Sequence, residues 1–179
     1  MGLDISSNRE RFLNFIPKEG VVLDLGCGSG RDSHFFLGNG YKVTSVDASI
    51  ELAKLASDFI GKPVVIKSFH EIDYFKEFDG IWACASLLHC PKSEMDGILR
   101  RITYALKPQG IVYMSFKHGL GERFDEKRRF FNDYTEVELV DLLEKQQNLT
   151  LFYSWIETKQ LRGGWQKWVN VLAKKEGDQ

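Results

Sequence analysis

The chain has 179 residues, of which 43% are apolar; this is enough for one substantial core and few for two, so we expect a single domain over residues 1–179. Its 24 lysines and arginines nearly balance its 25 aspartates and glutamates. The net charge therefore gives no overall electrostatic attraction to nucleic acid or to an anionic membrane. Neither a signal peptide nor a run of roughly 18 apolar residues is found, so we expect a cytoplasmic protein without a membrane partner.

In the first part of the chain, helical and strand-like segments alternate. Apolar spacing and Pro17 predict a leading helix within residues 1–17. A helix that begins near Asp32 and ends before Gly38 is predicted from its apolar spacing and the glycines that follow it. Apolar and β-branched runs predict strands at 21–25, 41–46 and 64–66, and a further helix is predicted at 50–60.

The second part of the chain continues the alternation up to residue 116. A strand is predicted at 81–85 and another at 111–116, after a turn at 107–110. Between them, Ser93 and Asp96 resemble a capping box that opens a helix through Ala105.

The last third of the chain has a different pattern. Residues 117–134 are polar and without periodicity, and we expect a lid or substrate-binding loop there. Thr135 and Glu138 form a capping box for a helix to about Glu144. Two strand-like segments, 149–157 and 166–174, flank Gly163 and Gly164 and are expected to pair antiparallel. Three tryptophans in this region are expected to have packing roles: Trp155, Trp165 and Trp168.

Alternating helices and nearly continuous apolar strands are typical of a parallel sheet with both faces covered. Together with the two tail strands, this predicts a doubly wound α/β fold. The sheet is expected to be seven-stranded and mostly parallel, with a C-terminal antiparallel hairpin.

A glycine-rich turn follows the first strand. Gly26, Gly28 and Gly30 suit a chain that bends sharply beneath a ligand, because glycine lacks the Cβ that hinders positive φ and close approach. A dinucleotide site has G-x-G-x-x-G, whereas here Arg31 stands in the place of the third glycine. Asp47 ends the second strand and can accept two hydrogen bonds from a ribose diol, as in both NAD and S-adenosylmethionine enzymes.

The motifs taken together resemble class I S-adenosylmethionine-dependent methyltransferases over roughly residues 9–175. The resemblance rests on 24–30, Asp47, 85–89 and 106–110, in this order. Residues 28–33 and 39–44 are similar to tellurite-resistance-type methyltransferases. The segments 88–89, 115–117 and 129–131 are similar to other small bacterial methyltransferases and to wobble-uridine tRNA methyltransferases.

The resemblance implies S-adenosylmethionine as cofactor and S-adenosylhomocysteine as product. It implies that the glycine turn lies under the methionine and ribose, that Asp24 orients this turn, that Asp47 binds the ribose hydroxyls, and that Phe69 flanks the adenine. Family members often have an acid for the adenine amino group at the position of Ser68. The implied cofactor residues are Asp24, Gly26, Cys27, Gly28, Gly30, Arg31, Asp32, Asp47, Ala48, Ser68, Phe69 and Ala85.

Some of these residues have simpler explanations. Asp32 at a helix start either contacts the cofactor or only complements the helix dipole. Arg31 either holds the cofactor's carboxylate or bridges acids. Cys27 is expected to be selected for small size, and the spacing of the three cysteines predicts neither a disulfide framework nor a metal site.

Candidate acceptor-site residues follow the fourth and fifth strands. His89 either takes a proton from the acceptor or caps the loop before Pro91. Lys117 contacts either the substrate or only solvent. Arg129 belongs to the basic run 127–129 and either binds a phosphate or carboxylate group or faces solvent. Tyr134 either walls an acceptor pocket or anchors the following helix.

The sequence therefore predicts direct in-line methyl transfer, most simply to a small-molecule acceptor. In-line transfer needs alignment and desolvation and no covalent residue. Two alternatives stay open: a tRNA methyltransferase of the wobble-base type, and a non-catalytic module that binds S-adenosylmethionine or S-adenosylhomocysteine. The glycine spacing disfavours an NAD(P) module. The acceptor atom and the oligomeric state are left open.

Overall fold

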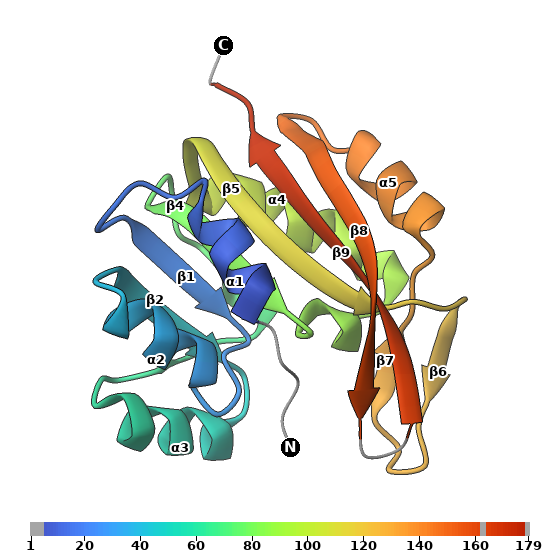
Figure 1. Cartoon of the computed structure of the whole chain (residues 1–179), viewed down its shortest axis with the longest axis horizontal. Helices are drawn as coiled ribbons and strands as arrows, with labels where there is room; N and C mark the ends of the chain where they lie inside the picture. Colours follow the sequence, from blue (N-terminus) through green and yellow to red (C-terminus); the bar gives the residue numbers. More distant parts are fainter. Residues whose placement is uncertain (1–5, 162–163, 178–179) are drawn as a thin grey trace.

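Seven strands form one twisted sheet in the computed structural model, which describes residues 6–161 and 164–177 (Figure 1). Their order is β3-β2-β1-β4-β5-β9-β8. The strands of this sheet are β1 (Val21–Leu25), β2 (Lys42–Asp47), β3 (Val65–Ile66), β4 (Phe78–Cys84), β5 (Leu106–Lys117), β8 (Leu149–Leu161) and β9 (Gly164–Lys175). The start of the expected leading segment, residues 1–5, and Gly163 lie outside the described residues.

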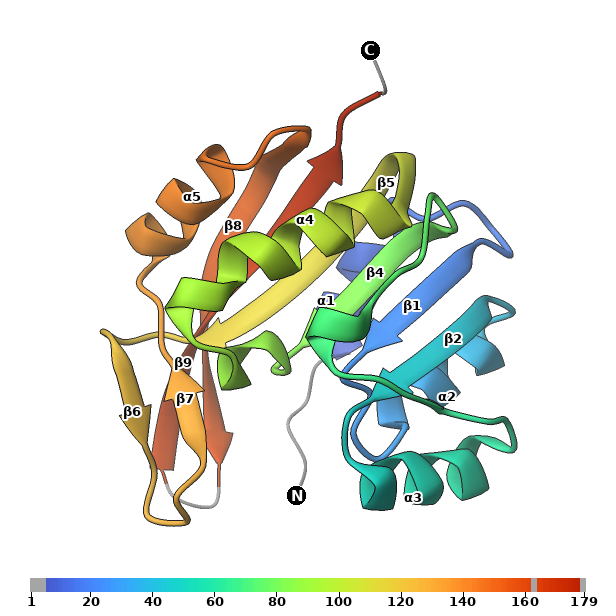
Figure 2. The ribbon, with the colours of Figure 1, turned by 180° about the vertical axis from the view of Figure 1, so that it is seen from behind.

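Helices cover both faces of the sheet. Three lie on one face and two on the other, as the two opposite views show (Figures 1 and 2). The first group is α1 (Ser6–Leu13), α2 (Arg31–Gly38) and α3 (Ile50–Ile60), and the second is α4 (Met95–Ala105) and α5 (Glu136–Glu144). Short 3₁₀ turns are η1 (Phe69–Glu71), η2 (Leu87–His89) and η3 (Lys92–Glu94).

The direction of the strands determines where a ligand can lie. β1 pairs in parallel with β2 and β4, and β4 pairs in parallel with β5, whereas β5 and β8 both pair antiparallel with β9. This confirms the predicted doubly wound sheet with its C-terminal antiparallel hairpin. From β1 the chain moves outward to β3 and then crosses back to β4. Ligands of open α/β sheets bind at such a switch point, outside the carboxyl ends of the strands.

Aromatic side chains fill the core beneath α1. Phe12 of α1 is fully buried, with its ring centroid 5.8 Å from that of Phe36 and 5.3 Å from that of Trp82. Trp82 stacks on Tyr113 with centroids 4.0 Å apart and an interplanar angle of 15°. The leading helix is therefore part of the core, because it covers the sheet between β4 and β5.

The segment 117–134 was predicted as a loop, and this is wrong for its centre. β6 (Glu122–Phe124) pairs antiparallel with β7 (Phe130–Asn132) as a separate hairpin beyond the carboxyl end of β5 (Figure 1). The connecting turn is closed by Asp125, whose carboxylate accepts backbone hydrogen bonds from Lys127 and Arg129, both 2.9 Å. An aspartate that binds the backbone in this way makes a turn that apolar periodicity does not reveal.

Two other local predictions are also wrong. α4 begins at Met95 without a side-chain cap, and Ser93 lies in η3. The expected partner, Asp96, instead accepts a hydrogen bond of 2.8 Å from Gln146 Nε2. Residues 107–110, expected as a turn, belong to β5, with Gln109 at φ +67° beside a register shift. The capping box of Thr135 and Glu138 is confirmed.

The three tryptophans of the closing hairpin have different environments. Trp168 is buried and Trp155 is half-buried, but Trp165 is 72% exposed, which contradicts its predicted packing role. Trp165 follows Gly164 at the start of β9, at the far end of the hairpin from α5 (Figure 1). In the described part of the chain, no helix has the length and apolar character needed to cross a membrane.

The burial of Phe12 predicts that α1 contributes strongly to stability. We expect Phe12→Ala to lower the free energy of unfolding by about 3–5 kcal/mol, because it leaves a cavity beside the rings of Phe36 and Trp82. Urea unfolding followed by circular dichroism measures this change. The control is Phe15→Ala, whose ring is 51% exposed, with an expected cost of about 1 kcal/mol or less. An equal loss of unfolding free energy in the two variants would contradict the conclusion that Phe12 makes α1 part of the core.

Candidate functional site

The glycine turn at the carboxyl end of β1 has the backbone that only glycine adopts easily. Gly26, Gly28 and Gly30 have φ values of +78°, +56° and +81°. A Cβ at Gly26 would lie 2.4 Å from the Cβ of Ser86, so the turn after β1 touches the turn after β4. A Cβ at Gly28 would meet nothing within 4 Å. The turn therefore packs closely on one side and is open on the other.

Asp47 joins the end of β2 to this turn. Its Oδ2 accepts a hydrogen bond of 2.8 Å from Gly28 N, and its Oδ1 accepts one of 2.9 Å from Ser49 N. An ionised carboxylate has about four acceptor positions. Two backbone bonds thus orient the carboxylate and leave acceptor capacity beside the open side of the turn, next to the exposed Ala48.

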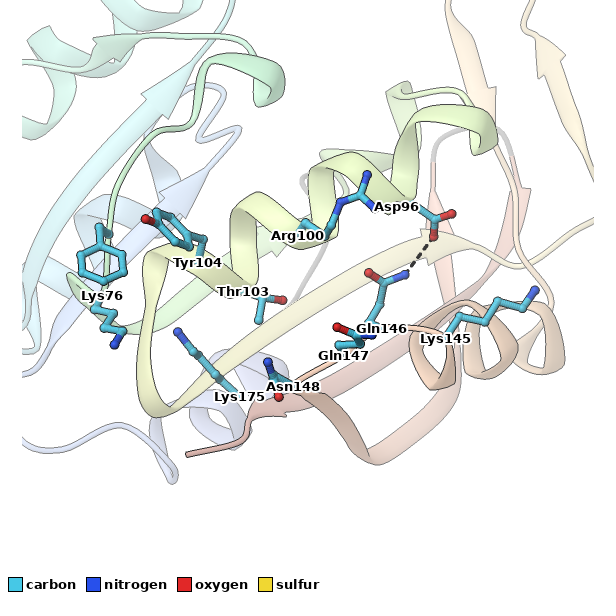
Figure 3. A pocket seen from close by; sticks show the side chains of 11 residues that line it. Lys76, Asp96, Arg100, Thr103, Tyr104, Lys145, Gln146, Gln147, Asn148 and Lys175 are labelled. Atoms are coloured by element: carbon cyan, nitrogen blue, oxygen red, sulfur yellow. Dashed lines mark hydrogen bonds between the residues drawn. The ribbon is translucent and has the colours of Figure 1, made fainter. Parts of the chain in front are cut away.

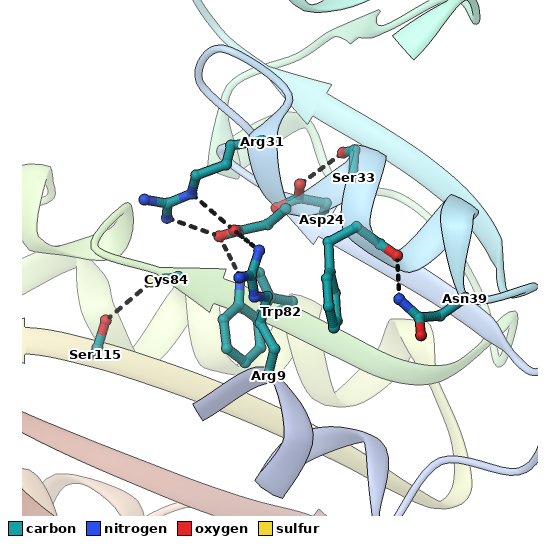
Figure 4. A network of polar contacts seen from close by, with 10 residues as sticks. Arg9, Asp24, Arg31, Ser33, Asn39, Trp82, Cys84 and Ser115 are labelled. Atoms are coloured by element: carbon teal, nitrogen blue, oxygen red, sulfur yellow. Dashed lines mark hydrogen bonds and ion pairs between the residues drawn. The ribbon is translucent and has the colours of Figure 1, made fainter. Parts of the chain in front are cut away.

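Two further carboxylates lie buried beneath the turn (Figure 4). Asp24 accepts a hydrogen bond of 2.6 Å from Ser33 Oγ, which also lies 2.7 Å from Ser45 Oγ. Burial, and secondarily the nearby charge of Asp32, raises the pKa of Asp24 to about 7. Asp24 therefore connects the end of β1 to the start of α2, and it carries a proton readily near neutrality.

The Asp32 carboxylate is occupied by protein donors. It accepts bonds of 3.0 Å from Arg31 Nε, 3.2 Å from Arg31 Nη2, 2.9 Å from Trp82 Nε1 and 3.5 Å from Arg9 Nη1 (Figure 4). Four donors match the about four acceptor positions of a carboxylate. Of the two roles left open by the sequence, a direct cofactor contact is therefore less favoured. Asp32 positions Arg9 and Arg31.

Arg9 is a candidate that the sequence interpretation missed. Its guanidinium carbon lies 4.1 Å above the Phe35 ring, and its side chain is 15% exposed. Within residues 6–161 and 164–177, its buried Nε has no hydrogen-bond partner. No sequence signal marks this residue, because only the packing of α1 on α2 brings it to Asp32.

Phe69, which the resemblance expects to flank the adenine, lies beside the glycine turn at Gly26. Its Cζ is 3.5 Å from the position that a Cβ of Gly26 would take. The backbone N–H and hydroxyl of Ser68 donate to Glu71 Oε2 at 2.8 and 2.7 Å. An acid therefore does lie beside Ser68, supplied from three residues later. The Ser68–Glu71 spacing of a capping box could have indicated it.

The end of β4 lies on the same side of the turn as Phe69, since Ser86 and Phe69 both lie beside Gly26. Ala85 has φ +51°, and its backbone N–H donates to Ser115 Oγ at 2.8 Å. The next residue, Ser86, is buried, and its hydroxyl has no hydrogen-bond partner among the described residues. A buried hydroxyl without a partner costs free energy. Its position against Gly26 makes it a further candidate for contact with a bound ligand.

His89 links the turn after β4 to the β6–β7 hairpin. Its Nδ1 lies 2.8 Å from the carbonyl oxygen of Phe130, and its ring is 4.9 Å from that of Phe131. A carbonyl oxygen only accepts hydrogen bonds, so Nδ1 carries the proton and Nε2 of the neutral ring is left as the basic nitrogen. The structural and the proton-accepting roles of this exposed histidine are compatible.

Three cationic side chains gather around the Phe131 ring. Lys117 Nζ lies 3.7 Å from the ring centroid, and the guanidinium carbons of Arg123 and Arg129 lie at 5.0 and 5.3 Å. Arg123 pairs with Asp133 at 2.6 Å, and Arg129 pairs with Asp125 at 2.7 Å. Desolvation, followed by the charge of Arg123, lowers the pKa of Lys117. We call these three residues the Phe131 cation cluster.

Tyr134 does not join this cluster. It is 3% exposed and packs edge-on against Phe116, with ring centroids 4.9 Å apart. The structure thus favours the anchoring role over the substrate role for Tyr134.

Neither thiol chemistry nor a metal site is indicated at this edge. Burial, followed by the charges of Asp24 and Asp47, raises the pKa of the Cys27 thiol to about 12, which agrees with a residue selected for small size. In the part of the chain that the structure describes, no three histidine, cysteine or acidic side chains group as a metal site requires.

Comparison with known proteins gives a family match over the core of the chain. Residues 22–110 match the model of a methyltransferase domain. YqeM of Bacillus subtilis (strain 168), a methyltransferase by name, is 32% identical over 113 residues, which are 57% of this chain and 46% of YqeM. The chain thus matches about half the length of this relative.

Solved structures share the fold over nearly the whole chain. A methyltransferase of Methanosarcina mazei, described as S-adenosylmethionine-dependent, has a TM-score of 0.81 at 21% identity and covers 94% of this chain and 98% of its own. The 1,6-didemethyltoxoflavin-N1-methyltransferase of Burkholderia thailandensis has a TM-score of 0.80 at 27% identity and covers 96% of this chain and 78% of its own. The latter structure contains bound 1,6-didemethyltoxoflavin and S-adenosylhomocysteine.

The raised pKa of Asp24 predicts a pH-dependent stability. Its pKa is about 7 in the folded protein against 3.8 for a free aspartate, so the folded state binds the proton more tightly. The stabilising contribution is therefore complete below 3.8 and is lost as the pH rises through about 7. Relative to Asp24→Asn, the wild type should lose unfolding free energy on the order of 3 kcal/mol over this interval.

Urea unfolding at a series of pH values measures this difference. The control is Asp58→Asn on the exposed surface of α3, for which the difference from wild type should not vary with pH. A wild-type stability that rises relative to Asp24→Asn across the same interval would show that Asp24 is held ionised.

Proposed function

Since the chain belongs to the class I S-adenosylmethionine-dependent methyltransferases, we propose that it transfers a methyl group from S-adenosylmethionine to a small acceptor carrying a carboxylate or phosphate. The product of the cofactor is then S-adenosylhomocysteine. The observation that carries the choice of acceptor is the Phe131 cation cluster, which lies beside His89 at the carboxyl edge of the sheet.

The residues of the glycine turn fit the cofactor. The open side of the turn at Gly28 and the oriented carboxylate of Asp47 suit the ribose and its hydroxyls. Phe69 lies on the side proposed for the adenine, with Ser68 and Glu71 next to it. The donors near Asp32, on Arg9 and Arg31, suit the carboxylate of the methionine part. When bound, the cofactor supplies an electrophilic methyl group on a sulfonium.

The remaining residues would bind and align the acceptor. Transfer by in-line displacement needs the nucleophile to be desolvated and aligned with the methyl group. Lys117, whose side chain is partly desolvated, would hold the anionic group of the acceptor, and Arg129 would add a second cation at the rim. His89 Nε2 would take the proton that the acceptor atom loses. Ala85 and the Ser86 hydroxyl would border the site of transfer.

Three observations support a small acceptor. The net charge of −1 gives no broad attraction to a polyanion such as tRNA. Two of the three cations of the cluster are already paired with acids, which leaves a compact cationic site and not an extended basic face. The methyltransferase from Burkholderia thailandensis, which shares the fold, binds a small heterocyclic acceptor.

The role proposed for Asp47 predicts a specific loss of cofactor binding. We expect Asp47→Ala to weaken S-adenosylhomocysteine binding by roughly tenfold or more, because the ribose hydroxyls lose a charged hydrogen-bond acceptor. Isothermal titration calorimetry measures the affinity. Asp58→Asn on α3 is the matched control, and unfolding curves show whether the variant remains folded. An affinity within about twofold of wild type would remove Asp47 from the site.

The role proposed for Lys117 predicts the chemistry of the acceptor. Labelled S-adenosylmethionine is incubated with the protein and a cell extract divided into a low-molecular-weight filtrate and a macromolecular fraction. We expect label in the filtrate, on a product that an anion-exchange column retains. Lys117→Gln should lower kcat/KM for that acceptor by roughly tenfold and leave S-adenosylhomocysteine affinity unchanged.

The same experiment separates the rival functions. Label in the macromolecular fraction that ribonuclease removes would indicate an RNA acceptor. Label on a small product that anion exchange does not retain would contradict the anionic acceptor while preserving methyl transfer. No transfer to any fraction, together with tight S-adenosylhomocysteine binding, would favour a non-catalytic binding module.

A further inference from the structure

A cavity lies at the amino edge of the sheet, away from the proposed methyl-transfer site. Its volume is about 700 Å³, and its walls are one side of α4 from Asp96 to Tyr104, the segment before β4 at Phe75 and Lys76, the turn between α5 and β8, and the end of β9 (Figure 3). Lys175 ends β9 beside the start of β5, since its neighbour Lys174 pairs with Ile111. None of the residues proposed to bind cofactor or acceptor lines this cavity. Its volume is that of a small-molecule site.

The lining of the cavity is cationic. It contains Lys76, Arg100, Lys145 and Lys175 against one acid, Asp96. The Asp96 carboxylate already accepts a hydrogen bond from Gln146 at 2.8 Å. Among the described residues, the side chains of Arg100 and Lys145 have no hydrogen-bond or ion-pair partner. In a chain of net charge −1, this local excess of positive charge favours an anionic ligand.

The same cavity has an aromatic ledge. Phe75 is 52% exposed and Tyr104 is 57% exposed, and their ring centroids lie 4.7 Å apart. Lys76 Nζ lies 5.0 Å from the centroid of the Phe75 ring. Two large rings that stay exposed side by side contribute little to the core. A flat ring stacked on them would remove this apolar surface from water.

We propose that this cavity binds a nucleotide, with the phosphate on Arg100 and Lys145 and the base against Tyr104 and Phe75. Arg100 and Tyr104 are one turn apart on α4, so their side chains are neighbours. The ligand's charged and aromatic parts then meet adjacent groups of matching chemistry. The exposed amides of Gln147 and Asn148 offer donors and acceptors to the polar edge of a base. The proposal does not rest on methyl transfer.

A free nucleotide and a nucleotide within a single strand present the same chemistry, and the test has an arm for each. The protein is first saturated with S-adenosylhomocysteine, so that the cofactor site does not take up the probe. Calorimetry then measures binding of adenosine and guanosine 5′-monophosphates, a short single-stranded RNA, adenosine, and inorganic phosphate. We expect saturable binding of a monophosphate or of the RNA, and weaker binding of adenosine and phosphate alone.

Variants locate the site. Arg100→Gln and Tyr104→Ala should each weaken this binding by about tenfold, through loss of a charged hydrogen bond and of a stacking surface. Lys18→Gln, an exposed cation outside the cavity, is the control and should have no effect. All three positions are exposed, and unchanged affinity for S-adenosylhomocysteine shows that each variant is folded.

The outcomes are distinct. Binding of a monophosphate that both variants weaken supports a free nucleotide, and binding of the RNA alone with the same dependence supports a single strand. Absence of binding to every probe overturns the proposal. Phosphate binding as tight as monophosphate binding, with no effect of Tyr104→Ala, would also overturn it, because no base would then be recognised.

Discussion

The Asp32 carboxylate accepts hydrogen bonds from three elements at once: Arg9 of α1, Arg31 of α2 and Trp82 of β4. Asp24 lies buried next to it, and two buried carboxylates are costly to ionise together. The guanidinium donors are at Asp32, and burial together with the Asp32 charge raises the pKa of Asp24 to about 7. The hydrogen bonds of Asp32 hold the leading helix, the start of α2 and the sheet in one arrangement, on which the cofactor side of the site depends.

The two ends of the sheet carry different chemistry. At the carboxyl edge, glycines, Asp47 and His89 follow separate strands, and the Phe131 cation cluster lies beyond them. At the amino edge, the cavity between α4 and α5 joins cations to exposed aromatic rings. The near-zero net charge of the chain does not reveal the Phe131 cation cluster or the cationic lining of the cavity, because acids elsewhere in the chain balance their charge. Net charge alone is therefore a poor guide to the ligands of this protein.

Most of the fold could be predicted because its signals are local. The strand over Val21–Leu25, the glycine turn and the capping box of Thr135 each depend on residues close together in sequence. The errors have two causes, a partner distant in sequence and strands too short to give a periodic signal. Asp96 was taken by Gln146, fifty positions away, instead of capping a helix. Asp125 closed a hairpin turn whose strands are only three residues long, too short for a periodic signal.

The sequence by itself determined the doubly wound sheet, the glycine turn after β1 and the placement of Asp47 at the end of β2, because strand direction brings the carboxyl ends of parallel strands to one edge. Only the tertiary structure decided what these groups contact. It joined Arg9 to Asp32, gathered three cations around Phe131, buried Tyr134 in the core and left Phe75 and Tyr104 exposed. Such contacts depend on the packing of helices against the sheet, and helix packing joins residues that no spacing in the sequence relates.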